Sequence, residues 1–290
     1  MLWPFCACVC FRDSHEKIVQ YIDLLMRKSE CDFFKCTRLT KKTFNFLVGE
    51  MEHTERFSST QQPRRGTPPT APATALAVTL WYLGTQSAQR DIAGRFDISQ
   101  GHLSVIVKDV VDFVCGLSQT VNRWPTEPQM NDVEEQFSSL AQFPGVIGAV
   151  DGCHIPISAP DYCQNDYLDR NHTHSVNLMA VCDANKKITY CFAGYPGSVH
   201  NRRVFANSAL GQAVDTSSRQ HFPSSRYHIV GDSAFQLQPH VMVLYRDTGA
   251  LTAAQLHYNK WLAQTRRIVE NAFGFFWRDV FVAWRDSSAS

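Results

Sequence analysis

The pattern of hydrophobic positions divides the chain into an N-terminal part with helical periodicity and a later part with strand-like runs. Apolar residues recur at helical spacing between residues 16 and 51, which predicts two helices with Thr40 as the N-cap of the second. Residues 52–74 are rich in Pro, Ser and Thr and predict a linker or an irregular loop. Helical spacing resumes in four further segments, at about 74–85, 88–96, 99–117 and 128–142.

The segment over about 88–117 resembles a helix-turn-helix. A short helix leads into a tight turn at Asp97–Ser99, and Ser99 is placed to cap the helix that follows. A plain helical hairpin that packs its apolar stripe inward explains the same pattern. The sequence therefore leaves both interpretations open.

From residue 143 the periodicity becomes that of strands. The segments "GVIGAVDG" and "HIPIS" surround one acid, and residues 175–184 and 187–195 predict two strands joined by a hairpin-like turn. A further strand is predicted in "YHIVGDSAF", and residues 252–277 predict a long closing helix. This order predicts an α/β fold in which helices flank a mixed sheet, preceded by a small all-helical module.

Composition limits the class of protein without defining its function. The 290 residues carry a formal charge of +1, so contacts with nucleic acid would have to come from local patches. The ten cysteines lack zinc-finger spacing, which favours reduced thiols in an intracellular protein. The apolar first eleven residues make a weak signal peptide, and no apolar run is long enough to span a bilayer. We therefore expect a soluble protein, in the nucleus or the cytoplasm.

Three acidic residues stand out by their apolar surroundings. Asp151 follows the run "VIGAV", Asp232 follows "HIVG", and Glu270 lies between apolar residues of the predicted C-terminal helix. Acids that follow strands meet at the carboxyl ends of those strands, where ligands bind in open α/β sheets. Each acid taken singly is also explained as a helix cap, a turn residue or a salt-bridge partner.

Clustered carboxylates repel one another unless a cation neutralises them. Oxygen ligands without Cys or paired His favour Mg²⁺ or Mn²⁺ over zinc. Two such ions about 3.5–4 Å apart can hold both the attacking water and the leaving oxygen of a phosphodiester. Periodicity alone does not decide between this hypothesis and the structural explanations.

The motifs "GVIGAVDGCHIPISAP", "HSVNLMAVCDANKKITYCFAGYPGSVHNRRVFANSAL", "VGDSAFQL" and "HYNKWLAQTRRIVENAFG" resemble, in this order, those of the PIF/Harbinger transposase-derived nucleases. The resemblance runs from about residue 74 to about residue 276. It implies a ribonuclease H-like fold and a DDE triad, at Asp151, Asp232 and Glu270, that binds divalent metal and cuts DNA. It also implies a nuclear setting and a separate Myb-like DNA-binding protein as partner.

Two departures from the family pattern bear on activity. Asn201 stands where the family usually has an acid expected to help hold metal, and the family extends further beyond the glutamate helix than this chain does. We expect the first to weaken metal binding and the second to leave the sheet less covered and Glu270 loosely held. A catalytically impaired DNA- or protein-binding protein that retains the transposase fold is therefore the alternative function.

Other polar groups near these acids allow further interpretations. His172 and His174 could share a zinc ion if they lay on one strand, and Ser198 with His200 could suggest a hydrolase, although no GxSxG motif is present. Basic side chains could clamp a DNA backbone, offset the acids or form ordinary surface ion pairs; these are Arg202, Arg203, Arg266 and Arg267.

The predicted organisation is an N-terminal extension over 1–14, a helical module over 15–125 and a DDE-type catalytic domain over 126–290 that is short at its C-terminus. The predicted reaction is Mg²⁺- or Mn²⁺-dependent cleavage of DNA phosphodiester bonds. Asp151 and Asp232 would bind the ions, and Glu270 would complete the second ion site and orient water.

Overall fold

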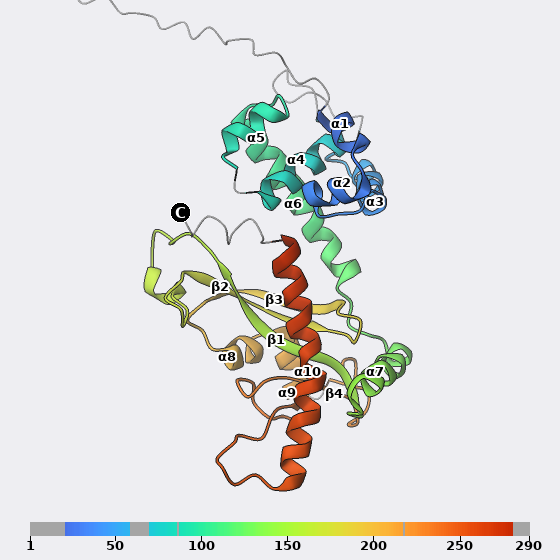
Figure 1. Ribbon diagram of the computed structural model, residues 1–290, viewed down its shortest axis with the longest axis vertical. Helices are drawn as coiled ribbons and strands as arrows, with labels where there is room; N and C mark the ends of the chain where they lie inside the picture. Colours follow the sequence, from blue (N-terminus) through green and yellow to red (C-terminus); the bar gives the residue numbers. More distant parts are fainter. Residues whose placement is uncertain (1–20, 59–69, 86, 217, 281–290) are drawn as a thin grey trace, which may run out of the picture. The chain divides into compact units, whose positions relative to one another are not determined.

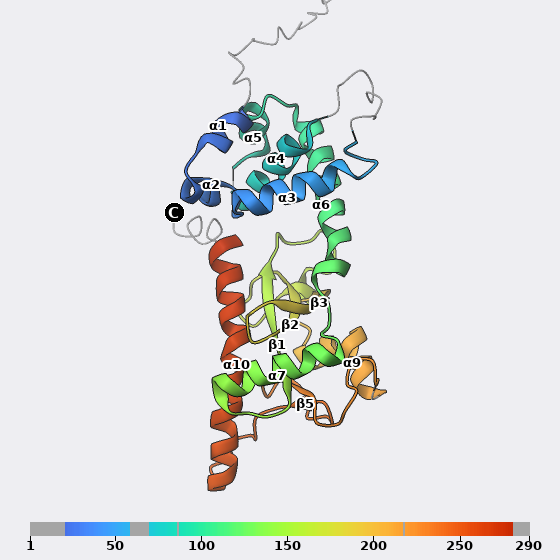
Figure 2. The same cartoon turned by 90° about the vertical axis from the view of Figure 1, so that its right-hand side faces the viewer.

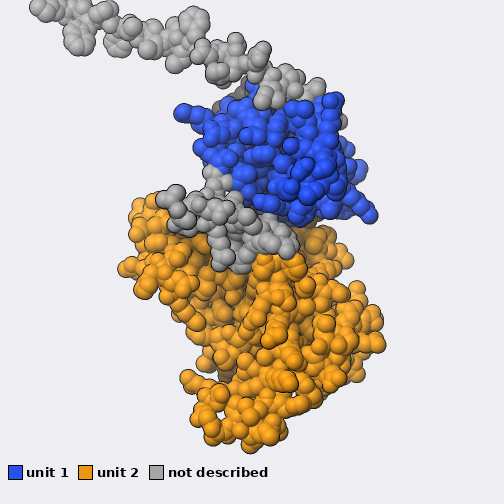
Figure 3. All heavy atoms as spheres, viewed as in Figure 1, with its two compact units in different colours: residues 1–116, 279–290 blue, residues 117–278 orange. Residues whose placement is uncertain are grey.

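The computed structural model describes residues 21–58, 70–85, 87–216 and 218–280. These residues belong to two compact units, one within 1–116 and 279–290 and the other within 117–278 (Figure 3). The predicted extension over 1–14 and the middle of the predicted linker lie outside the described residues. The predicted domain boundary at residue 125 stays a prediction.

The first unit is helical. Its helices are α1 (Tyr21–Arg27), α2 (Glu30–Thr37), α3 (Lys41–Glu52), α4 (Pro72–Gly84), α5 (Gln89–Arg95) and the first part of α6 (Gln100–Val121). Thr40 is the N-cap of α3, as predicted, and its hydroxyl accepts a hydrogen bond from the Thr43 amide at 3.2 Å. The prediction of two helices before residue 52 was wrong, because Ser29 caps a separate helix by accepting from the Asp32 amide.

A single hydrophobic core holds these helices together. Five consecutive residues of α4, from Ala75 to Thr79, are buried, so this helix is surrounded by the others. Phe33 and Phe44 meet edge to face in the same core, with ring centroids 5.4 Å apart. The core therefore comes from α4 together with the helices before and after it.

Helices α5 and α6 flank the short turn that the sequence predicted. Asp97 adopts a left-handed backbone conformation with φ of 53°, and the Ser99 hydroxyl accepts a hydrogen bond from the His102 amide at 3.2 Å. The geometry is that of two helices joined by a tight turn. Whether this segment binds DNA stays a prediction.

The second unit is built on a five-stranded mixed sheet in the order β3-β2-β1-β4-β5. Figures 1 and 2 together label its strands. Its strands are β1 (Val146–Pro156), β2 (Ser175–Cys182), β3 (Ile188–Pro196), β4 (His228–Val230) and β5 (Val241–Met242). The β1–β2 and β2–β3 pairs are antiparallel, whereas β1–β4 and β4–β5 are parallel. This sheet, flanked by helices and preceded by a helical part, confirms the predicted fold class.

Helices cover both faces of the sheet. The remaining elements are α7 (Glu127–Ala141), a 3₁₀ helix (Gln164–Tyr167), α8 (Asn201–Ala206), α9 (Ala209–Asp215) and α10 (Ala253–Val280). Apolar residues of α8 and α9 pack with Ile147, Met179 and Ile229 in one core, and those of α10 pack with Ala149 and Ala180 in another. Figures 1 and 2 show the long α10 running along the sheet. The successive β1 residues Ala149 and Val150 therefore face different helices.

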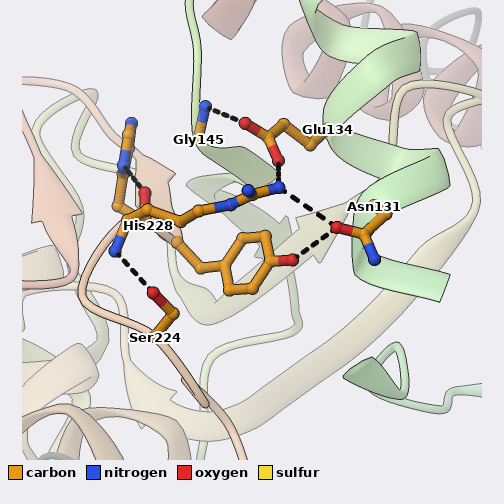
Figure 4. Close-up of polar contacts among 7 residues, drawn as sticks. Asn131, Glu134, Gly145, Ser224 and His228 are labelled. Atoms are coloured by element: carbon orange, nitrogen blue, oxygen red, sulfur yellow. Dashed lines mark hydrogen bonds and ion pairs between the residues drawn. The ribbon is translucent and has the colours of Figure 1, made fainter. Parts of the chain in front are cut away.

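A polar junction fixes α7 to the starts of β1 and β4. One Glu134 carboxylate oxygen accepts a hydrogen bond from the Gly145 amide at 2.9 Å, and the other pairs with Arg226 (Figure 4). Asn131, on the same helix, accepts a hydrogen bond from the Tyr227 hydroxyl at 2.8 Å. Gly145 has φ of 76°, and a Cβ there would lie 2.3 Å from the Arg226 carbonyl oxygen, so the junction requires glycine.

None of the helices among the described residues is both long and apolar enough to cross a membrane.

Candidate active site

Asp151 and Asp232 lie side by side on neighbouring strand paths. In the parallel β1–β4 pair, Ala149 is the register partner of Val230. Asp151 and Asp232 each follow that pair by two residues, so the two chain paths carry them to the same level. Strand β1 continues to Pro156, so Asp151 lies within a strand and not at its end as the sequence suggested.

Glu270 is connected to Asp151 through Arg266. The Arg266 guanidinium donates to Asp151 Oδ2 at 2.9 Å and also pairs with Glu270, one turn further along α10. Arg266 and Asp151 are 18% and 16% exposed, whereas Glu270 is 48% exposed. The Arg266 guanidinium thus joins two predicted site residues, Asp151 on β1 and Glu270 on α10.

The environment of Asp151 disfavours its negative charge. Burial raises the pKa of this carboxyl above its usual value, although the Gly152 amide and Arg266 act in the opposite direction. The charges of Asp232 and Glu270 also raise the pKa of Asp151. The negative charges of Asp232 and Glu270 thus act on Asp151, and Arg266 offsets part of this charge.

A polar cavity of about 490 Å³ opens beside this cluster. Asp151 and Asp232 line it together, whereas Glu270 does not. The other lining residues come mainly from the loop before β2 and the loop before α8, and include His154, Asp169, Arg170, Ser198, His200 and Asn201. A second, apolar groove of about 610 Å³ lies beside α10 and contains none of the three acids. The polar cavity is the better candidate because it combines the acids with hydrogen-bonding groups.

Asn201 lines the cavity with its side-chain oxygen already engaged. That oxygen accepts a hydrogen bond from the buried Asn177 amide at 2.9 Å. Asn201 also lies so close to Gly152 that a Cβ on the glycine would be 2.6 Å from the same oxygen. Asn201 therefore supports the cavity wall on the α8 side of β1.

Sequence reasoning missed the support for the opposite end of the cavity. Asp169 is buried and accepts hydrogen bonds from the amides of Asn171 and Thr173 and from the Ser175 hydroxyl. Ser175 in turn contacts the His154 ring at 3.2 Å. Asp169 sits in the polar stretch "YLDRNHTH", and no apolar run there signals a buried acid.

The competing interpretations find no support in the described residues. His200 is the N-cap of α8, and its Nδ1 accepts from the Arg202 amide, which is a structural role. No group of three His, Cys, Asp or Glu among the described residues is arranged to hold a metal ion. His172 and His174 therefore belong to no such group. Burial raises the pKa of the nearby Cys153 thiol to about 12, so this side chain stays a neutral thiol.

The three acids fit a divalent cation by chemistry but not by ready-made geometry. Carboxylate oxygens are the ligands that Mg²⁺ and Mn²⁺ prefer, and the mutual repulsion at Asp151 would be relieved by a cation. The described residues nevertheless contain no preformed three-ligand cluster, and Arg266 provides the positive charge at Asp151 and Glu270. A metal ion would have to share or take over this position.

The mixed five-stranded sheet flanked by helices is consistent with a ribonuclease H-like fold. Residues 150–282 match the family model described as DDE superfamily endonuclease.

Several curated proteins are similar to the chain. "Putative nuclease HARBI1" of Rattus norvegicus is 28% identical over 73% of this chain and 59% of its own length. The Homo sapiens protein of the same name is 28% identical over 70% of this chain and 56% of its own. "Protein ALP1-like" of Arabidopsis thaliana is 24% identical over 81% and 60%, respectively.

The matched domain and these relatives confirm the resemblance to the Harbinger transposase-derived nucleases. The chain spans between 56% and 60% of the length of the three relatives. No solved structure shows a significant match to it.

Proposed function

We propose that the protein is a divalent-metal-dependent endonuclease that cleaves DNA phosphodiester bonds with Asp151, Asp232 and Glu270. The observation that carries this proposal is the register of β1 and β4, which brings the two aspartates to one cavity. The endonuclease family of residues 150–282 supports the reaction type. The family resemblance supports DNA as the substrate. The same resemblance and the carboxylate oxygens of the three acids support the need for a divalent metal ion.

The three acids have two roles in this proposal. A divalent cation bound at the acids would supply positive charge to the scissile phosphate and lower the pKa of a water molecule. Asp151 and Asp232, which line the cavity, would hold this cation. Glu270, the most exposed of the three, orients the attacking water by accepting its hydrogen bond.

A plasmid-nicking assay tests the proposal. The full chain should convert supercoiled DNA to the nicked form in the presence of Mg²⁺ or Mn²⁺. The reaction should stop when EDTA is added, because EDTA removes the divalent ion. Asp151→Ala should lose this activity, whereas a change of the exposed Asp161 to Ala should retain it. Equal activity in Asp151→Ala and the unmodified protein would reject the assignment.

One observation favours the alternative, a DNA- or protein-binding protein with impaired catalysis. The described residues form no ready metal cluster, and Arg266 is paired with two of the three acids. Calorimetry separates the two functions: the nuclease binds Mn²⁺ at millimolar concentration or below, whereas the alternative retains DNA affinity without binding the ion.

The cellular setting and the partner are proposals carried by the family resemblance. We infer a nuclear location and a separate Myb-like protein that brings the nuclease to DNA. Co-purification of the full chain with such a protein from nuclear extract, and its loss when the N-terminal unit is deleted, would support both inferences.

A further inference from the structure

We propose that Arg266 is a built-in counter-cation that keeps Asp151 and Glu270 together before metal binds and competes with the metal for them. This inference rests on the proposed metal-dependent function and names how the same site is regulated. Arg266 is thus a positioning residue, because it acts on the acids and not on the DNA.

The contacts of Arg266 are those expected of an ion substitute. Its guanidinium bridges acids from a strand and from a helix, with Nη1 at 2.9 Å from Asp151 Oδ2 and Nη2 paired with Glu270. The other Asp151 oxygen accepts from the Gly152 amide at 2.8 Å. Each carboxylate oxygen of Asp151 therefore already has one partner, and an ion at Oδ2 would compete with the guanidinium for that oxygen.

The placement of Arg266 makes this competition strong. Arg266 and Asp151 are both more than four-fifths removed from solvent, so water screens their attraction poorly. Surface ion pairs, by contrast, contribute little. The free energy needed to separate Arg266 from Asp151 therefore opposes metal binding. This cost lowers the affinity of the protein for the ion.

The neighbouring Arg267 provides a matched control. It carries the same charge one residue further along α10 but is exposed. Arg266→Met and Arg267→Met lower the net charge of the protein equally, so a general charge effect would appear in both variants. An effect confined to Arg266→Met comes from the carboxylate pairs.

The test is the dissociation constant of Mn²⁺, measured by calorimetry on the full chain without DNA. We expect Arg266→Met to bind Mn²⁺ about tenfold more tightly than the unmodified protein, because the ion no longer competes with a guanidinium. Arg267→Met should stay near the unmodified value. Arg266→Lys should fall between, because an ammonium keeps the charge but lacks the planar fork that bridges two carboxylates.

The possible outcomes separate this inference from the proposed function. Equal or weaker Mn²⁺ binding by Arg266→Met, with measurable binding by the unmodified protein, overturns the role of Arg266 and leaves the nuclease proposal intact. Absence of Mn²⁺ binding in the unmodified protein and in every variant overturns both. If Arg266→Met does not fold, Arg266→Gln replaces it, because the amide keeps a hydrogen-bond donor without the charge, and the same criterion applies.

Discussion

The buried side-chain amide of Asn177 donates a hydrogen bond to the Asn201 side-chain oxygen at 2.9 Å. This bond connects β2 to the start of α8 and fixes one wall of the cavity that Asp151 and Asp232 share. An aspartate at position 201 could accept the same hydrogen bond. Its negative charge would then face a cavity that already contains three aspartates, Asp151, Asp169 and Asp232.

We therefore predict that Asn201→Asp binds Mn²⁺ about tenfold more tightly than the unmodified protein, since a further carboxylate strengthens attraction for a hard cation. Calorimetry measures the change. Asn207→Asp, at the other end of α8, makes the same chemical change at a position that does not line the cavity and should leave the affinity unaltered. Unchanged binding in Asn201→Asp would show that residue 201 does not influence the ion.

Asp169 should make stability depend on pH. Burial opposes its ionisation, but hydrogen bonds from Thr173, Asn171 and Ser175 outweigh burial, and the pKa of Asp169 lies below its usual value. A lowered pKa in the folded state stabilises the fold above the unfolded value of 3.8, and this contribution disappears as pH falls through the folded value.

Asp169→Asn should therefore lower the free energy of unfolding by about 1–3 kcal/mol at pH 7. The difference from the unmodified protein should shrink as the pH approaches the lowest value at which both unfold cooperatively. Urea unfolding at several pH values measures it, with the exposed Asp166→Asn as the matched control. A difference that is independent of pH would contradict the assigned hydrogen bonds.

Glu134 should matter for stability and not for the active site. Glu134→Ala removes the acceptor of the Gly145 amide and the partner of Arg226. We expect a loss of about 1–3 kcal/mol in the free energy of unfolding, with no change in Mn²⁺ affinity. The exposed neighbour Glu135→Ala should change neither quantity by a measurable amount. Altered metal binding in a folded Glu134→Ala protein would place this junction within the functional site.

The element types could be predicted from sequence wherever local pattern and fold agree. The long C-terminal helix, the β2–β3 hairpin and the cap at Thr40 all have local signals and occur in the structure. The break at Ser29 was missed because the apolar spacing continues across it. The two-residue strand β5 was missed because it is defined by pairing with β4 and not by its own composition.

Only part of the candidate active site could be predicted from the sequence. The apolar surroundings of Asp151 and Asp232 marked them, but their alignment depends on a parallel pairing between distant segments. The sequence placed Arg266 near Glu270, one turn away, yet its bond to Asp151 joins residues 115 positions apart. Long-range contacts of this kind have no local signature, and the buried Asp169 shows the same limit.

We propose that the acids of β1, of the segment after β4 and of α10 act together on DNA. The most direct test of this proposal is the rate at which Asp232→Asn nicks supercoiled plasmid in Mn²⁺, compared with the unmodified protein and with the control Asp215→Asn. We predict a loss of at least about 100-fold for Asp232→Asn, because the amide removes a charged ligand without changing the size of the side chain. Nicking by Asp232→Asn at the rate of the unmodified protein, in a preparation free of contaminating nuclease, would show that Asp232 takes no part in cleavage.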